Sequence, residues 1–381
     1  MSKEKRRVPK LRFPGFTEDW EQRKLSEIVT INPKTELPDE FKYVDLESVV
    51  GTNLLGFQVI KKENAPSRAQ RLASYGDVFY QTVRPYQRNN YLFENVDKDM
   101  VFSTGYAQLR SKLDSYFLLT LVQNNNFVKV VLDNCTGTSY PAINRSELGK
   151  IIVQIPSNEV EANQIGKVFR GIDKSITLHQ RKLEQLNLKK KALLQKLFPK
   201  NGECYPELRF PGFTDAWEQR KFGELFEYER PDAYIVKSDN YNNDFNMPVL
   251  TANKAFILGY TNEENSYNKP SIIFDDFTLD RKYVDFPYML KSSAIKILTS
   301  KNQHNLRFLF ERLNSTRFEV LGHARHYISV VQNTTTLCPS VDEEVCISNL
   351  LTKFDEIITL HQRKLDHLQL QKKALLQQMF V

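Results

Sequence analysis

The sequence predicts an α+β protein in which two pseudo-symmetric mixed α/β modules are separated by two long helices that form an antiparallel coiled coil. Three observations predict this fold class: two segments occur twice, each helix carries an unbroken apolar heptad, and strand-like runs lie between the duplicated segments. The 381 residues suffice for two or three domains with cores of their own. A hydrophobic content of 41% and a charged content of 26% are typical of globular proteins.

The duplication comprises an opening segment and a helical segment. Residues 11–25 and 208–222 are identical at 12 of 15 positions, and residues 178–198 and 360–380 are identical at 15 of 21. The residues between these segments show no comparable identity. Two long copies exclude a solenoid, which needs three or more short repeats. They predict two equivalent modules, related by a pseudo-twofold axis, with different recognition surfaces on one frame.

The order of the segments predicts the domain boundaries. The first module spans 1–155, the first helical segment 156–200, the second module 201–337 and the second helical segment 338–381. In the first module we expect strands at 43–50, 76–83, 100–110 and 150–155, and a helix at about 114–132. In the second we expect strands near 248–258, 271–278 and 293–299, a helix at 305–321 and a loop around 322–336.

Both helices contain a heptad seam that is sustained over more than four heptads. In the first helix the seam consists of Ile165, Phe169, Ile172, Ile176, His179, Leu183, Leu186, Lys190, Leu193 and Leu197. In the second it consists of Ile347, Leu351, Phe354, Ile358, His361, Leu365, Leu368, Lys372, Leu375 and Met379. Two unrelated amphipathic surface helices are the alternative, which the shared phase of the seams disfavours. We expect His179 and His361 to set the register, and the two lysines to extend their ammonium groups to solvent.

Charge predicts that the two helices are antiparallel. The first half of each helix is acidic and the second half is basic, so antiparallel pairing brings opposite charges together. Pro199 ends the first helix, and Ser340–Glu343 has the S-x-x-E form of a capping box at the start of the second. The seam from 165 to 197 would be ~48 Å long, at ~1.5 Å per residue. Such a pair would hold one module at each end of a rigid spacer.

The composition also bears on the class of protein. Met1–Arg7 leads into no apolar stretch and no run of ~18 apolar residues occurs, so we expect neither a secretory signal nor a membrane span. The four cysteines form no C-x-x-C pair, which favours a reducing cytoplasm over a disulfide framework or a zinc ribbon. The net charge of +7 permits nucleic-acid binding, and residues 156–200 carry ten Lys or Arg against four Asp or Glu.

Two duplicated motifs carry a resemblance to a known family. They are L-R-F-P-G-F-T-x-x-W-E-Q-R-K at 11–24 and 208–221, and H-Q-R-K-L with K-K-A-L-L-Q at 179–195 and 361–377. Together with Gly76–Tyr80 and the loop Gly137–Pro141, they resemble the specificity subunit of type I restriction–modification enzymes over essentially the whole chain. The second module matches less closely, with Gly322–His326 in place of the Gly-Thr-Ser-Tyr loop.

The resemblance implies a DNA reader that is not itself an enzyme. Each module would be a target-recognition domain that reads one half of a split, asymmetric sequence in double-stranded DNA, and the helices would set the spacer. Two adenine methyltransferase subunits would dock on the helices, and two endonuclease/translocase subunits would join them. No cofactor is expected in this chain, whereas S-adenosylmethionine and ATP are expected in the partner subunits. A cytoplasmic location without a membrane partner fits this role.

The motifs of the relevant enzymes are missing. Gly51–Gly56 is followed by Phe57 and Gln58, so it is not a phosphate-binding loop, and neither [DN]-P-P-[YF] nor G-x-G-x-x-G occurs. We therefore expect no catalytic residue. His323 and His326 could be proposed as a metal pair with Cys338, but two histidines three apart in a loop lack the usual ligand context, and we expect no metal.

Candidate DNA contacts are the polar and aromatic residues of exposed loops, because arginine favours guanine, amides favour adenine, and aromatic rings pack on sugars or bases. The first module offers Arg84, Tyr86, Gln87, Arg88, Asn89, Asn90, Thr138, Ser139, Tyr140 and Arg145. The second offers Asn253, Lys254, Arg281, Lys282, Tyr283, His323, Arg325 and His326. For 84–91, a solvated loop without contacts is the alternative. For the whole chain, the alternatives are a tandem scaffold that binds proteins or peptides and a self-sufficient methyltransferase or nuclease.

Overall fold

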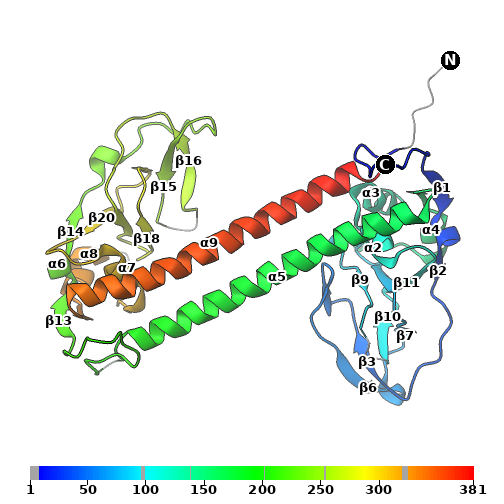
Figure 1. Ribbon diagram of the computed structural model, residues 1–381, viewed down its shortest axis with the longest axis horizontal. Helices are drawn as coiled ribbons and strands as arrows, with labels where there is room; N and C mark the ends of the chain where they lie inside the picture. The colour runs from blue at the N-terminus through cyan, green and yellow to red at the C-terminus, as the bar shows by residue number, and fades with distance from the viewer. Residues whose placement is uncertain (1–7, 96–98, 138, 201, 253–254, 320–324) are drawn as a thin grey trace. The chain divides into compact units, whose positions relative to one another are not determined.

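A computed structural model describes residues 8–95, 99–137, 139–200, 202–252, 255–319 and 325–381 (Figure 1). The chain forms two compact units. Unit 1 comprises Met1–Lys182 and His361–Val381, and unit 2 comprises Leu183–Leu360. Each unit therefore contains one α/β module and a part of both long helices. The four consecutive segments predicted from the sequence do not coincide with these units, because each helix packs partly with one module and partly with the other.

Unit 1 is built on two four-stranded sheets. Their strand orders are β6-β3-β10-β7 and β2-β11-β8-β9, and the small pairs β1-β12 and β4-β5 complete the unit. The strands are β1 (Glu21–Lys24), β2 (Val29–Ile31), β3 (Glu40–Val44), β4 (Val49–Val50), β5 (Asn53–Leu54), β6 (Gln58–Lys61), β7 (Ala69–Leu72), β8 (Asp77–Gln81), β9 (Tyr91–Leu92), β10 (Met100–Ser103), β11 (Tyr106–Ser111) and β12 (Ile152–Ile155). All five residues of β8 are buried.

Three predicted elements of the first module are each split in the structure. The strand expected at 43–50 is β3 and β4, which are separated by a turn in which the Asp45 carboxylate accepts from the amides of Glu47 and Ser48. The strand expected at 100–110 is β10 and β11, which are separated at Gly105, where a Cβ would lie 2.8 Å from the Leu46 side chain. The helix expected at 114–132 is α2 (Ser115–Gln123) and α3 (Asn125–Asp133). Asn124 divides them because its backbone is extended and its side chain accepts a hydrogen bond from the amide of Asn126. The other helical elements of the unit are α1 (Leu25–Ile28), α4 (Arg145–Lys150) and the 3₁₀ turns η1 (Lys62–Asn64) and η2 (Pro85–Gln87).

Unit 2 repeats most of this architecture. The sheet β14-β20-β17-β18 corresponds to β2-β11-β8-β9, and β16-β15-β19 corresponds to β6-β3-β10 with the same parallel pair in it. The strands are β13 (Glu218–Lys221), β14 (Phe226–Glu229), β15 (Met247–Leu250), β16 (Ile257–Thr261), β17 (Ser271–Asp275), β18 (Arg281–Val284), β19 (Met289–Leu290), β20 (Ile295–Ser300) and β21 (Thr335–Cys338). In place of β7, unit 2 has a single antiparallel bridge between Tyr267 and Tyr288, next to β19.

The predictions for unit 2 were wrong at three places. The strand expected at 248–258 is a hairpin of β15 and β16, and the helix expected at 305–321 is the shorter α7 (Leu306–Ser315). The loop expected around 322–336 contains α8 (His326–Ser329), η4 (Val331–Asn333) and the start of β21. Strand β21 forms because it pairs with β13 of the opening segment. The two strands are more than 100 residues apart in the sequence, so no local pattern predicts this pairing. The remaining short elements are α6 (Phe222–Leu225) and η3 (Asp232–Tyr234).

The long helices are α5 (Glu159–Leu197) and α9 (Val341–Gln378), drawn in green and in orange to red in Figure 1. Within unit 1, Asp173 lies 2.6 Å from Lys372, and Nδ1 of His179 lies 2.8 Å from Nδ1 of His361. Within unit 2, Lys190 lies 2.6 Å from Asp355. Because residue numbers rise along α5 as they fall along α9, the helices are antiparallel, which confirms the prediction from charge.

Burial along the two helices follows the heptad. Every residue of the predicted seam is buried or half-buried. Leu178, Leu188, Leu360 and Leu370 lie outside the seam, and 66–67% of each is exposed. The two seam lysines do not extend to solvent as we expected. Lys190 pairs with Asp355 and Lys372 pairs with Asp173, because the acidic half of one helix lies opposite the basic half of the other.

The two copies of the opening segment anchor the helix ends in the same way. Arg12 forms a two-pronged ion pair with Glu161 at the start of α5, at 2.6 and 2.8 Å, and its equivalent Arg209 does so with Glu343 at the start of α9, at 2.9 and 2.8 Å. These carboxylates raise the pKa of both guanidinium groups. The capping box expected at 340–343 is therefore only half formed. Ser340 accepts from the amide of Glu343, but the Glu343 carboxylate binds Arg209 instead.

The other end of each helix is held by the same segment. Amides of Leu11 and Leu208 donate to the last carbonyls of α9 and α5, at Gln378 and Lys196. The Trp20 ring packs edge-on against Phe380 after α9, and the Trp217 ring packs likewise against Phe198 after α5. Each tryptophan lies in the main core of its unit with 2% of its surface exposed. The motif repeated at 11–24 and 208–221 thus connects each α/β module to the helix pair.

Candidate nucleic-acid interface

In unit 1 the candidate contacts gather around the loop between β8 and β9. Arg84 and Arg88 flank η2 and have positive φ values of 53° and 54°, a conformation that few non-glycine residues adopt. Amide side chains stabilise this loop, since Gln81 donates to Gln87 at 2.8 Å and Asn89 accepts from the amide of Gly51 at 2.9 Å. The strained turn leaves the side chains of Tyr86 and Gln87 exposed. Strain of this kind often marks a functional loop.

A second candidate segment, 139–141, lies against this loop. The amide of Arg84 donates to the carbonyl of Pro141 at 2.7 Å, and Val83 pairs with Ala142. The Arg84 guanidinium is 4.3 Å from the centre of the Tyr140 ring, a cation–π contact that orients both groups. Half of Tyr86 and 63% of Tyr140 are exposed. The structure therefore brings together the segment that contains Arg84 and Tyr86 and the segment that contains Ser139 and Tyr140. The two segments are more than 50 residues apart in the sequence.

The structure contradicts the DNA contact predicted for Asn90, and it gives Arg88 a structural role within unit 1. Asn90 is buried, and its side-chain oxygen accepts from the amide of Gln81, so it cannot reach a ligand. The Arg88 guanidinium donates to the carbonyl of Gln123 at 3.2 Å and to Asn125 at 2.7 Å. Arg88 thus holds the loop to α2 and α3. Arg145 is exposed at the start of α4, and Thr138 lies outside the described residues.

The candidates of unit 2 lie on and around β18. Arg281 donates to Asn314 at 2.8 Å, and its burial lowers its pKa. The Tyr283 ring lies 5.2 Å from the guanidinium of Arg307, so it too is engaged within the unit. Lys282 is exposed between these two residues. Of the three, Lys282 is the side chain best placed to meet a ligand.

The prediction for His326 is also contradicted. This residue is fully buried. Its backbone amide and its ring nitrogen Nδ1 each lie 2.9 Å from the carbonyl oxygen of Asp276, the residue after β17. Its neighbour Arg325 is exposed. Asn253, Lys254 and His323 lie outside the described residues.

The sequence reasoning missed the loop of unit 2 that corresponds to 84–90. It is the turn from Asp276 to Asp280 between β17 and β18, at the same place in the matching sheet. Phe277 and Thr278 are exposed there, and Leu279 has a positive φ of 61°. The only available signal was the position after a buried strand, because the turn carries two aspartates and no arginine. Asp276 is buried beside Lys296, so the side chains that this turn exposes are Phe277, Thr278 and Asp280. The two units therefore present loops of different composition at equivalent places.

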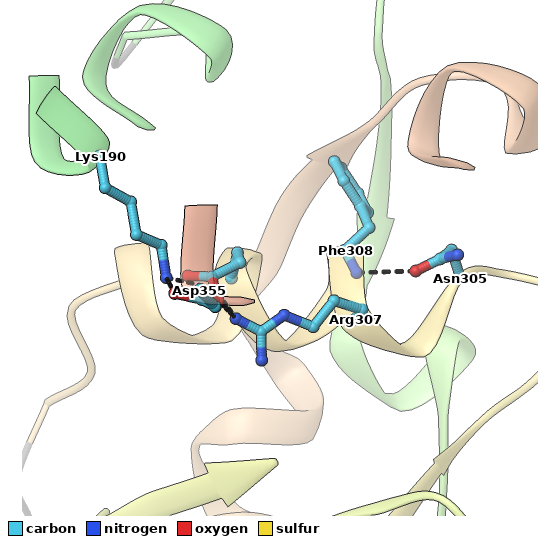
Figure 2. Close-up of polar contacts among 6 residues, drawn as sticks. Lys190, Asn305, Arg307, Phe308 and Asp355 are labelled. Atoms are coloured by element: carbon cyan, nitrogen blue, oxygen red, sulfur yellow. Dashed lines mark hydrogen bonds and ion pairs between the residues drawn. The ribbon is translucent and has the colours of Figure 1, made fainter. Parts of the chain in front are cut away.

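An ion-pair cluster joins α7 to the helix pair in unit 2 (Figure 2). Lys190 of α5, Asp355 of α9 and Arg307 of α7 meet there, and Glu311 lies 2.7 Å from Arg307. Asn305 begins α7 by accepting a hydrogen bond from the amide of Phe308 at 3.0 Å. In unit 1, Tyr116 of α2 connects the module to the helix pair. Its hydroxyl donates to Asp173 of α5 at 2.7 Å, and Asp173 also pairs with Lys372 of α9. Burial and the neighbouring Asp173 raise the pKa of Tyr116.

Within the described ranges, no three or more His, Cys, Asp or Glu residues lie together as metal ligands would. Nor does any helix in these ranges combine the length and apolarity needed to cross a membrane.

Comparison with known proteins gives a consistent result. The family model for the type I restriction modification DNA specificity domain matches residues 17–188 and 214–370. The specificity subunit of Escherichia coli type I restriction enzyme EcoR124I/EcoR124II is 41% identical over 133 residues, which are 33% of this chain and 32% of that protein. The putative type I restriction enzyme MjaX specificity subunit of Methanocaldococcus jannaschii is 21% identical over 397 residues, which cover 94% of this chain and 92% of that protein. The chain thus spans about a third of the first relative and most of the second.

Two solved structures share the fold. The crystal structure of the type I restriction–modification S subunit from M. genitalium has a TM-score of 0.70 at 14% identity, over 98% of this chain and 99% of that chain. A chain from a study of complex assembly and conformational transition in the type I R-M system has a TM-score of 0.50 at 19% identity, with 97% of both chains covered. At these identities the likeness concerns the fold alone.

Proposed function

The chain belongs to the type I restriction modification DNA specificity family, and on this basis we propose that it selects the DNA sequence on which a type I restriction–modification complex acts. Each unit reads one half of a bipartite, asymmetric target in double-stranded DNA. One observation carries this proposal. The two units share their anchoring contacts, yet they present loops of different chemistry at equivalent positions. A common frame with different exposed loops is what an asymmetric target requires.

The residues proposed to face DNA differ between the halves. Unit 1 offers Arg84, Tyr86, Gln87 and Tyr140, a set suited to guanine, adenine and stacking contacts. Unit 2 offers Phe277 and Thr278 in the turn after β17, with Lys282 and Arg325 near them. Because the exposed turn of unit 2 carries an aromatic ring and a hydroxyl and no arginine, we expect apolar and hydroxyl contacts to contribute more to its readout.

The long helices are proposed to set the distance between the two half-sites. The seam holds them in one antiparallel register, which the contacts in each unit support. Inserting seven residues into α5, matched by seven in α9, should lengthen the DNA spacer and leave both half-sites unchanged, because a heptad preserves the phase of the seam. A change in either half-site would contradict this role.

The helices are also proposed to dock two methyltransferase subunits. Leu178 and Leu188 of α5 and their repeat equivalents Leu360 and Leu370 of α9 expose two thirds of their surface. Exposed leucines are unfavourable in water, and their recurrence at the same positions of both helices favours two copies of one partner. Endonuclease/translocase subunits would join through the methyltransferases. S-adenosylmethionine and ATP would be bound by these partners, and this chain would provide no catalytic group.

Methylation mapping tests the proposal. The complete chain is co-expressed with a methyltransferase subunit, and modified adenines are mapped by long-read sequencing. Wild-type protein should direct methylation to one bipartite sequence. The pair Tyr86→Ala and Gln87→Ala should change one half-site, and Phe277→Ala with Thr278→Ala should change the other. Methylation at unrelated sequences, or without this chain, would refute the proposal.

A salt titration separates the proposal from a scaffold that binds peptides. Duplex binding should weaken steeply as salt rises, because counterions return to the phosphates. A peptide scaffold would not bind the duplex. The purified chain, supplied with S-adenosylmethionine alone, should neither methylate nor cleave DNA, whereas activity would favour a self-sufficient enzyme.

A further inference from the structure

A groove in unit 1 contains two arginines that have no carboxylate partner. It has a volume of about 900 Å³ and lies between the loop after β2, strand β7 and the start of α4. Arg71 of β7, Arg145 of α4 and Lys34 of the loop line it, with Glu36 as its acidic residue. Neither Arg71 nor Arg145 forms an ion pair with any residue that the structure describes. This concentration of unpaired positive charge needs an explanation.

Two polar atoms in the groove lack hydrogen-bond partners. They are Nε of Arg71 and Oγ1 of Thr35, both buried within the described part of the chain. A buried donor without a partner is destabilising, and most such groups in folded proteins are satisfied. Burial lowers the pKa of Arg71, and the nearby positive charge of Arg145 lowers it further. These groups therefore lower the stability of the protein when no ligand is bound, and an anion in the groove would compensate for this loss.

The groove adjoins the candidate DNA-contacting loops. The amide of Ile143 donates to the carbonyl of Thr82, and Ala142 pairs with Val83 directly before Arg84. Arg145 follows this segment by two residues, and Tyr140 precedes it. A duplex in contact with Arg84 and Tyr140 would bring its sugar–phosphate backbone close to Arg145.

We propose that Arg71, Arg145 and Thr35 form a phosphate-binding site that holds one phosphodiester of the DNA backbone. This inference rests on the proposed function and adds to it a contact that fixes the position of the duplex without reading sequence. Two guanidinium groups match phosphate oxygens in geometry and charge, and the Thr35 hydroxyl adds a neutral donor. Lys34 adds a long-range attraction at the rim.

The site is specific to unit 1. In unit 2 a single bridge between Tyr267 and Tyr288 takes the place of strand β7, and the segment 262–268 that contains it has no arginine or lysine to correspond to Arg71. The register of β1 with β12 and of β13 with β21 aligns Arg145 with Ile328, an apolar residue that is 52% exposed. The two halves of the duplex would therefore be held by different backbone contacts.

Binding of duplex DNA at several salt concentrations tests the site. The full chain, with a methyltransferase subunit, is compared with Arg71→Gln and with Arg23→Gln, an exposed arginine of unit 1 outside the groove. Arg71→Gln should weaken binding roughly tenfold and reduce the slope of log affinity against log salt by about 0.9, since one phosphate contact is lost. The loss should be equal for target and non-target duplexes. Arg23→Gln should change neither quantity.

Thermal melting distinguishes binding from a structural role. Without DNA, Arg71→Gln should melt at the wild-type temperature or above it, because an unpaired buried donor and a like-charge neighbour are removed. A lower melting temperature together with an unchanged salt slope would overturn the inference. Should Arg71→Gln fail to fold, Arg145→Gln, at an exposed position, tests the same slope.

Inorganic phosphate tests the source of the anion. It should raise the melting temperature of the wild type more than that of Arg71→Gln, and duplex DNA should remove this difference. If phosphate stabilises the wild type but Arg71→Gln binds DNA normally, the groove binds free anions and the DNA contact is refuted. If the wild type itself does not bind duplex DNA, the proposed function fails. If the wild type binds and Arg71→Gln binds equally well, only this inference fails.

Discussion

Units 1 and 2 use the same contacts to join their modules to the helices, and they differ where a ligand would be met. Arg12 and Arg209 bind equivalent glutamates, and Trp20 and Trp217 pack on equivalent phenylalanines. The loop after the buried strand, in contrast, carries Arg84, Tyr86 and Arg88 in unit 1, whereas in unit 2 it exposes Phe277, Thr278 and Asp280. The duplicated motifs are therefore structural, and recognition resides in the residues that were not duplicated. Four experiments test whether the two units are equivalent.

The largest effect is expected from removing either anchoring tryptophan. Trp20→Ala and Trp217→Ala should each destabilise their own unit by about 3–5 kcal/mol, because a large buried ring is replaced by a cavity. The chain contains two tryptophans, one in each unit, so each variant leaves one fluorophore that reports on the other unit during urea unfolding. Circular dichroism measures the total loss. A loss below 1 kcal/mol in one unit alone would show that the two joints are not equivalent.

A smaller effect is expected from the paired arginines. Arg12→Ala and Arg209→Ala should each cost about 2–4 kcal/mol at neutral pH, because each leaves a buried glutamate without its counter-ion. The double variants Arg12→Ala with Glu161→Gln and Arg209→Ala with Glu343→Gln are matched controls. They should recover part of the stability in urea denaturation, and no recovery would contradict the ion-pair explanation.

The ion-pair clusters should distinguish the units. Asp355→Asn in unit 2 removes two ion pairs, with Lys190 and with Arg307, and leaves Glu311 as the carboxylate near both cations. Asp173→Asn in unit 1 removes one ion pair, with Lys372, and keeps a hydrogen bond from Tyr116. We expect losses of about 2 kcal/mol and about 1 kcal/mol, since these groups are only partly buried. Urea unfolding followed by the tryptophan of the affected unit measures both. Equal losses would mean that Arg307 contributes nothing beyond what Tyr116 does.

The smallest effect concerns pH. Burial raises the pKa of Glu344 above its usual value of 4.5, although the amide of Asn305 and the ring of His304 oppose this shift. A carboxyl with a raised folded-state pKa stabilises the fold below the unfolded pKa, and this contribution is lost as pH rises through the folded pKa. Unit 2 should lose up to about 1 kcal/mol as pH rises through this window, and Glu344→Gln should abolish the dependence.

Unit 1 provides the internal control for that experiment, because its equivalent position is Ala162. Fluorescence of Trp20 should report no corresponding change in unit 1 over the same pH range. An identical dependence in both units, or in the Glu344→Gln variant, would assign the effect to another group.

Much of the fold followed from patterns that are local in the sequence. The helix pair was predictable because its seam and its charge gradient are each read along one helix, and antiparallel pairing is the arrangement that satisfies both. The splitting of α2 from α3 was not predicted, because an asparagine within an apolar stretch can lie in a helix or cap one. Strand β21 was missed because its partner β13 is more than 100 residues away.

The candidate site was only partly predictable for a similar reason. Residue type suggested Asn90, Arg88 and His326, but burial and hydrogen bonding engage all three within their own units. Arg71 was overlooked because an arginine in a strand usually lies at the surface with water around it. Only the packing of β7 beside α4 places its guanidinium near Arg145.

Repetition, heptads and charge are properties of the linear chain, so the duplication, the positions of the long helices and their antiparallel pairing could all be derived from the amino-acid sequence. Which polar side chains remain free to contact a ligand follows only from the folded structure. That outcome depends on the competition between an external partner and the buried hydrogen bonds inside the fold. Such a competition is settled only when residues distant in sequence come into contact.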